Sequence, residues 1–198
     1  MPKLREFFCS LLKSRRGSSS VEFVIIAPVL LAALVSGVVV FDAVRAKRQT
    51  GLAVQTASDL ITRLDFINDG RRDNIFAAAR TIIGKYDNGS NLVMTMSSIA
   101  KPVDPDSEDL VLVWSEATDP KAELEADDLG GLDLPNISDG DSIILVQFSL
   151  DYVPVLKFGS LATELEFFDA AIRRPRFVSE VCYELENGDL SCSVNQAT

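Results

Sequence analysis

The chain has 198 residues, a formal net charge of −10 at pH 7 and no histidine. The acidic balance argues against nucleic acid as a partner, and the lack of histidine removes the usual general base and the commonest metal ligand. Nucleophile-elbow, P-loop and dinucleotide-binding motifs are absent as well, so we expect neither an enzyme nor a cofactor.

The charge is unevenly distributed along the chain. Residues 1–17 contain five basic residues and one glutamate, a net charge of +4, so the rest of the chain carries −14. Residues 23–41 then follow without a charged residue. As a helix they would extend roughly 28 Å, close to the ~30 Å hydrocarbon core of a bilayer. The pattern predicts a membrane-spanning helix over residues 18–41, with one carboxylate, Glu22, near its start.

Two interpretations of the N-terminus are open. A secretory signal peptide would have a shorter apolar region that ends in a small-residue cleavage site and is followed by polar sequence. Here Ala32 and Ala33 are followed by more apolar residues. The other interpretation places a cut between Gly17 and Ser18, so that a basic leader is removed and the helix stays in the mature protein.

The stretch RRGSSSVEFVIIAPVLL, residues 15–31, resembles the start of the TadE/TadG-like family, minor pilin-like (pseudopilin) proteins of the tight-adherence (Flp) pilus system. A short second match to some family members is RPRF, residues 174–177. The positions that match the family pattern at the N-terminus are Arg16, Gly17, Val21, Glu22, Phe23 and Pro28. The resemblance implies a pilin-like fold and cleavage after Gly17 by a prepilin peptidase in the membrane.

The resemblance also implies a role for Glu22. Cleavage would free an α-amino group at Ser18, with a pKa of about 8, and Glu22 would meet the amine of a neighbouring subunit. A carboxylate carried toward the bilayer centre costs on the order of a few kcal/mol unless it is paired. The alternative is that Glu22 only reaches the interface of an ordinary anchor. Pro28 removes one helical hydrogen bond, and we expect a kink there.

The basic residues predict the topology. The leader has five of them against Arg45, Lys47 and Arg48 after the helix, so the N-terminus should be cytoplasmic and the acidic domain periplasmic. The expected partners are the prepilin peptidase, other pilin or pseudopilin subunits, the pilus assembly platform and the inner membrane, with possible export into an extracellular pilus. The competing hypothesis is an unprocessed single-pass protein whose periplasmic domain binds a partner or forms a scaffold.

The remaining chain predicts an α+β domain. Apolar residues at helical spacing extend the first helix through residues 42–67, and Asn68-Asp69-Gly70 should end it, with Gly70 in a left-handed conformation. A second helix is expected over residues 71–83, followed by an antiparallel sheet. The expected strands are residues 92–98, 110–114, 142–152, 163–172 and 177–185. The domains would be residues 1–17, 18–41, 42–67 and 68–198.

Cys182 and Cys192 flank a predicted hairpin that turns at Asn187-Gly188. Pairing across a two-residue turn would oppose Cys182 to Ser193, so a disulfide needs a longer loop or a bulge. We expect the bridge, because an exported domain meets an oxidising compartment. The alternative is two unrelated thiols.

Two acidic stretches are candidates for a metal site. Residues 104–109 carry alternate carboxylates but lack the glycine and the final glutamate of a calcium loop. Residues 119–140 are expected to form a solvated loop. No metal is therefore predicted.

Overall fold

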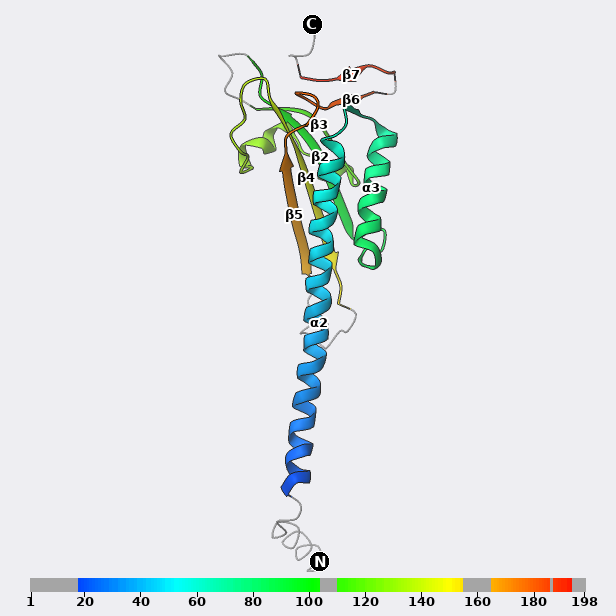
Figure 1. The fold of residues 1–198 in the computed structure, drawn as a ribbon, viewed down its shortest axis with the longest axis vertical. Helices are drawn as coiled ribbons and strands as arrows, with labels where there is room; N and C mark the ends of the chain where they lie inside the picture. Colours follow the sequence, from blue (N-terminus) through cyan, green and yellow to red (C-terminus); the bar gives the residue numbers. More distant parts are fainter. Residues whose placement is uncertain (1–17, 104–109, 155–164, 186, 194–198) are drawn as a thin grey trace, which may run out of the picture. The chain divides into compact units, whose positions relative to one another are not determined.

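The computed structural model describes residues 18–103, 110–154, 165–185 and 187–193 (Figure 1). The chain divides into two compact units, Met1–Ala43 and Val44–Thr198. Helix α2 (Ser18–Ile61) contributes to both units. The second unit contains a second helix and two sheets, so the fold is α+β, as the sequence predicts.

In the second unit, α2 buries one face rich in small residues. The buried positions are Ala46, Thr50, Ala53, Val54, Ala57, Ser58 and Ile61, and Thr62 just after the helix is buried as well. Their spacing of three and four places them on one side of a helix. Small side chains allow the helix axis to approach its neighbours closely, and the hydroxyl of Thr50 is satisfied by the carbonyl of Ala46 at 3.2 Å.

The prediction that this helix continues to residue 67 is wrong. Helix α2 ends at Ile61, and Phe66–Ile67 forms strand β1, which pairs in parallel with Cys182 and Tyr183. Ile67 is fully buried in that pairing. The local periodicity favours a helix here, but Phe66 and Ile67 pair instead with a strand that lies more than one hundred residues away along the chain.

The predicted role of Gly70 is wrong as well. Helix α3 (Asp69–Ile83) begins here, and the side chain of its N-cap residue Asn68 accepts a hydrogen bond from the Arg71 amide at 3.0 Å. Gly70 therefore lies in the first turn of a helix and does not end one. Gly84, with φ of +60°, ends α3, and a 3₁₀ turn follows at Gly84–Tyr86.

A four-stranded antiparallel sheet forms the centre of the unit. Its strands are β2 (Leu92–Ala100), β3 (Val111–Ala117), β4 (Ser142–Tyr152) and β5 (Leu165–Arg173), in the order β3-β2-β4-β5. The predicted bounds of β4 agree with the structure, and those of the other three differ by one to three residues. Met94 opposes Phe148 and Met96 opposes Val146, and all four side chains are fully buried.

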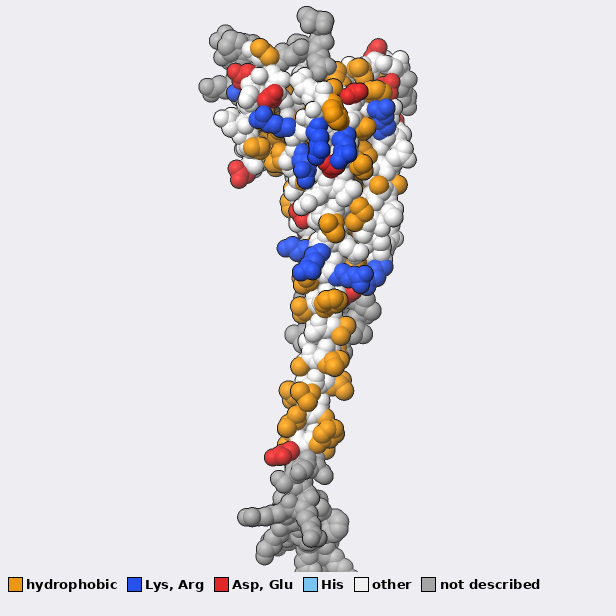
Figure 2. Space-filling view, viewed as in Figure 1, with side chains coloured by type: hydrophobic (Ala, Val, Ile, Leu, Met, Phe, Trp, Pro, Cys, Tyr) orange, Lys and Arg blue, Asp and Glu red, His pale blue; other side chains and the backbone are white. Residues whose placement is uncertain are grey.

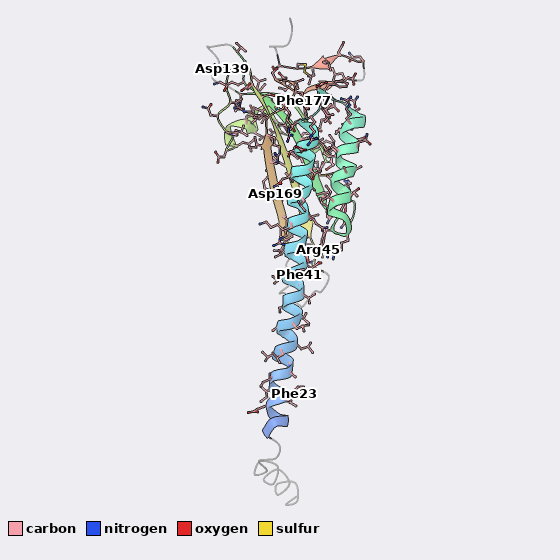
Figure 3. The ribbon with its side chains drawn as sticks, viewed as in Figure 1. Phe23, Phe41, Arg45, Asp139, Asp169 and Phe177 are labelled. Carbon is pink, nitrogen blue, oxygen red and sulfur yellow. A yellow bond between two sulfur atoms is a disulfide. The ribbon has the colours of Figure 1, made fainter. Side chains whose placement is uncertain are left out.

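Helix α2 covers the face of the sheet that carries Phe148. Ile144 opposes Arg173 across β4 and β5, and Arg173 Nε donates to Ser58 Oγ of α2 at 3.0 Å. Phe148 opposes Asp169, whose carboxylate would lie 2.8 Å from a Cβ placed on Gly51. Gly51 therefore lets α2 lie close to β5 (Figures 1 and 3).

The segment expected to be a solvated loop packs on the opposite face. It forms 3₁₀ turns η3 (Pro120–Ala122) and η4 (Ala126–Gly131), and Leu129 and Ile137 are buried against the sheet. The cluster also contains Ile99, Ile143 and Leu145, with Leu124, Leu132 and Leu134 packed against it. The prediction of a solvated loop rested on the many acidic residues of this segment. Its leucines give the segment an apolar side that packs on the sheet.

A second sheet has the order β1-β6-β7. Its strands β6 (Cys182–Glu184) and β7 (Leu190–Ser191) form an antiparallel pair. The prediction of a strand from residue 177 is wrong, because β6 begins at Cys182 and residues 174–181 are irregular. Trp114 Nε1 donates to the Val181 carbonyl at 2.7 Å and anchors the irregular segment to β3.

Candidate functional site

The first unit presents an apolar helix surface. Among the residues that the structure describes, one helix is long and apolar enough to cross a membrane, and it lies near the N-terminus. Its large apolar side chains are exposed, from Phe23 at 72% to Phe41 at 71% (Figures 2 and 3). Exposed apolar surface of this extent is unfavourable in water and marks contact with lipid or with other apolar helices.

Glu22 is the one ionisable residue between positions 18 and 41. It is exposed and lies in the second turn of α2, four residues after Ser18. Positions four apart lie on the same side of a helix. Of the predicted cleavage site, Ser18 is the first residue of α2, and Gly17 lies outside the described residues.

Pro28 lies inside α2, and the helix is continuous across it. Proline has no amide hydrogen, so the Val24 carbonyl loses its usual donor. Farther along, Ser36 Oγ donates to the Ala32 carbonyl at 2.8 Å and so satisfies its own hydroxyl within the helix. Both features are compatible with an apolar surround, because the polar groups involved are few and mostly paired within the helix.

The disulfide between Cys182 and Cys192 is present, with Cα atoms 4.8 Å apart. Tyr183 pairs with Ser191 and Glu184 with Leu190, and continuing this register opposes the two cysteines. The strands are therefore joined by a connection longer than two residues, which is one of the two ways in which the sequence could form the bridge. The Leu185 amide donates to the Asp189 carbonyl at 2.8 Å at the base of this connection. The buried carboxylate of Glu180 accepts from the amide and hydroxyl of Ser193, which fastens the strand end beyond Cys192.

Removing the disulfide is expected to lower the stability of the second unit. The double variant Cys182→Ala/Cys192→Ala should lose about 2–3 kcal/mol of unfolding free energy, because the unfolded chain regains the freedom of a ten-residue loop. Denaturant unfolding of the full chain in detergent, followed by the fluorescence of its single tryptophan, measures this. Cys9→Ala is the matched control, and an equal loss in that variant would contradict the assignment.

A polar network fastens the start of α3 to both sheets. Arg72 forms ion pairs with Glu116 at 2.7 Å and with Asp69 at 3.1 Å, and Tyr183 donates a hydrogen bond to Asp69. Burial opposes the charge on Arg72, but hydrogen bonds to Glu116 and Asp73 raise its pKa above the ordinary value. Burial, the hydrogen bond to Asp69 and the charge of Glu116 raise the pKa of Tyr183 above its ordinary value.

The raised pKa of Tyr183 predicts a loss of stability in alkali. Below about pH 10, the pKa of an unfolded tyrosine, both states hold the proton and the contribution is fully present. Above that pH the unfolded chain loses the proton first, so stability falls with rising pH. Tyr183→Phe should lower the free energy of unfolding by about 1 kcal/mol at neutral pH. It should also make that free energy fall less steeply as the pH rises above about 10. Fluorescence of Trp114, whose ring centroid lies 5.9 Å from that of Tyr183, reports both. An unchanged alkaline slope would contradict it.

The structure exposes a cluster of arginines and one phenylalanine that the sequence analysis did not predict to form a surface. The sequence placed residues 173–177 at the junction of two predicted strands, residues 163–172 and 177–185. In the structure the strand ends at Arg173, and Phe177 is 73% exposed. A Pro175 that blocks strand continuation is the one local signal that could have indicated this.

In the described part of the chain, neither the potential metal ligands nor the groove between α2 and α3 indicates a reactive site. Those residues contain no group of three or more cysteine, aspartate or glutamate side chains placed to hold a metal. The acidic stretch 104–109 lies outside them. One groove is lined by Leu60, Leu64, Arg71, Asn74 and Ile75, between the end of α2 and α3. Its lining is mostly apolar and offers a contact surface more than a reactive site.

Comparison of the chain with protein-family models, with curated proteins and with solved structures finds no match. The function is therefore inferred from the residues of this chain and from the resemblance of its N-terminal segment.

Proposed function

We propose that this protein is a minor pilin or pseudopilin that takes part in the assembly or initiation of a tight-adherence pilus. In this proposal a prepilin peptidase removes residues 1–17, and the mature chain begins at Ser18. The observation that carries the proposal is an exposed apolar helix segment, residues 18–41, whose one ionisable residue, Glu22, lies four residues after Ser18.

The mechanism is charge neutralisation in an apolar surround. Cleavage frees a cationic amine at Ser18 of one subunit, and the Glu22 carboxylate of a neighbouring subunit pairs with it. Neither charge is stable alone against lipid or an apolar helix. Pairing them between subunits couples helix packing to processing, because an uncleaved chain has no amine at position 18.

The topology belongs to the same proposal. The basic leader stays in the cytoplasm, residues 18–41 cross the inner membrane, and the chain from residue 42 onward lies in the periplasm. A disulfide between Cys182 and Cys192 suits an oxidising compartment. The basic residues that follow the apolar segment, Arg45, Lys47 and Arg48, are exposed, which suits the level of lipid headgroups. Figure 3 labels Arg45 just beyond Phe41.

The test is the intact mass and N-terminal sequence of the protein from its native membrane, with and without reduction. We expect a chain that starts at Ser18 and gains two hydrogen masses on reduction. A chain that starts at Met1 would leave the second hypothesis, an unprocessed membrane-anchored protein whose domain binds a partner or forms a scaffold.

A further inference from the structure

Four arginines and one phenylalanine gather near the C-terminal end of α2. We call Arg63, Arg173, Arg174, Arg176 and Phe177 the arginine patch. Arg63 follows the helix, and the other four lie at the end of β5 and just after it. The amide of Arg176 donates to the Thr62 carbonyl at 2.9 Å, which holds the two stretches together. Figure 2 shows basic side chains gathered on this face, and Figure 3 places Phe177 beside the end of α2.

The patch keeps an excess of positive charge after its internal contacts are counted. Asp59 pairs with both Arg63, at 2.7 Å, and Arg176, at 2.5 Å. Arg174 pairs with Asp141 at 2.9 Å, and Arg173 donates to the neutral Ser58. Among the residues that the structure describes, two carboxylates therefore serve four guanidinium groups. Each guanidinium has five N–H donors, so these side chains retain donors for further carboxylates.

Phe177 gives the patch an apolar element. At 73% exposure it is the most exposed of the large apolar side chains in the described residues. Aromatic residues and arginines together are the side chains most enriched at the energetic centres of protein interfaces. An exposed phenylalanine in a short segment that contains proline is not required on a surface that contacts only water, and beside arginines it favours a role in binding a partner.

The same domain carries a surface of opposite charge. We call residues 119–133 the acidic segment. It contains six exposed carboxylates and a single basic residue, Lys121. Leu124 and Leu132, which pack on the core, remain partly exposed between these carboxylates. The acidic segment therefore combines negative charge with apolar surface, as the arginine patch combines positive charge with an aromatic ring.

The two surfaces lie on opposite faces of the four-stranded sheet. Arg173 contacts α2 from the face that carries Ile144. The acidic segment contacts the other face, because Thr95 Oγ1 donates to the Ala122 carbonyl at 3.0 Å and Leu124 N donates to Ser115 Oγ at 2.8 Å. Adjacent residues of a strand point to opposite faces. In Figure 1 the turns η3 and η4 lie on the side of the sheet away from α3. One domain cannot bring these two surfaces together by itself.

We propose that the arginine patch of one copy binds the acidic segment of a second copy of this chain, so that domains stack front to back. Such a contact joins two different surfaces and can repeat from copy to copy, as in a filament. The inference rests on the proposed function, because gathering copies in an assembly makes a contact of modest area effective. It adds to that function a specific contact between the domains outside the membrane.

The test replaces Phe177 with the photoreactive residue p-benzoylphenylalanine in the full chain, expressed in its native membrane. This side chain keeps the aromatic ring at the patch. We expect irradiation to give a covalent dimer, and mass spectrometry of its peptides to join position 177 to residues 119–133. The same photoreactive residue in place of the exposed Thr81 of α3 is the matched control and should give little dimer.

Charge reversal then tests the pairing. Arg174→Glu should lower the dimer yield about tenfold, and adding Asp127→Arg should restore much of it. An intact Cys182–Cys192 bridge in each variant reports that the domain has folded. Crosslinks from position 177 to position 177, to another protein or to lipid would overturn the proposal, as would an absence of dimer in a folded chain. N-terminal sequencing of the same sample tests the proposed cleavage after Gly17 independently of the contact between domains.

Discussion

Gly17→Leu is expected to leave the chain unprocessed, so that mass spectrometry of membranes finds the full chain starting at Met1. The resemblance implies a peptidase that accepts glycine before the cut. A site shaped for a residue without a side chain has no space for an isobutyl group, and the loss of cleavage should be nearly complete. The retained leader also keeps the amine away from position 18, so assembly should fail together with processing.

Gly37→Leu is the matched control for that experiment. It makes the same substitution farther along the chain, at a position of α2 where an added Cβ meets no atom within 4 Å. Processing of this variant should equal that of the parent. If Gly17→Leu is processed as well as the Gly37 control, or if the parent itself starts at Met1, the pilin hypothesis is wrong and the anchored scaffold is favoured.

Glu22→Gln is expected to separate assembly from processing. The substitution keeps the shape of the side chain and removes its charge. Cleavage after Gly17 should continue, but the Ser18 amine of the neighbouring subunit would then lack its partner. Leaving one member of a buried ion pair unpaired costs about 3–5 kcal/mol, so incorporation into the pilus should fall about a hundredfold or more. Pilus fractions compared with membrane fractions by immunoblot measure this.

Glu166→Gln provides the comparison for Glu22→Gln, since Glu166 is an exposed carboxylate of β5 that lies outside the arginine patch and the acidic segment. Its incorporation should fall far less than that of the Glu22 variant. Equal incorporation of the Glu22 variant and the parent would show that Glu22 only reaches the membrane interface. A loss of both processing and assembly in Glu22→Gln would instead place the carboxylate in peptidase recognition.

The N-terminal helix was predictable because its signal is local. Residues 23–41 contain no charge, and an apolar run of that length specifies a helix independently of the remaining chain. The bounds of β4 were predictable for a similar reason, because Ser142–Tyr152 is rich in β-branched and aromatic residues between turn signals. The cleavage at Gly17 and the role of Glu22 stay predictions that rest on the resemblance.

The errors occurred where a distant partner decides the local structure. Residues 62–67 continue a helical pattern, but pairing with β6 turns Phe66–Ile67 into a strand. Asn68 is a favourable residue both after one helix and before the next, and only the start of α3 shows which role it takes. Phe177 reads as a strand residue, yet the segment from Arg174 to Val181 contains no strand in the structure.

The sequence by itself determined a helix able to cross a membrane, an acidic α+β domain after it, and two cysteines close enough along the chain to bridge. These follow from composition and short-range periodicity, which do not depend on the rest of the fold. Only the folded structure shows where α2 ends and how the register of β6 and β7 opposes Cys182 to Cys192. It also placed the arginine patch and the acidic segment on opposite faces of one sheet. Those features depend on strand register and on contacts between residues far apart in the chain, which local propensity does not encode.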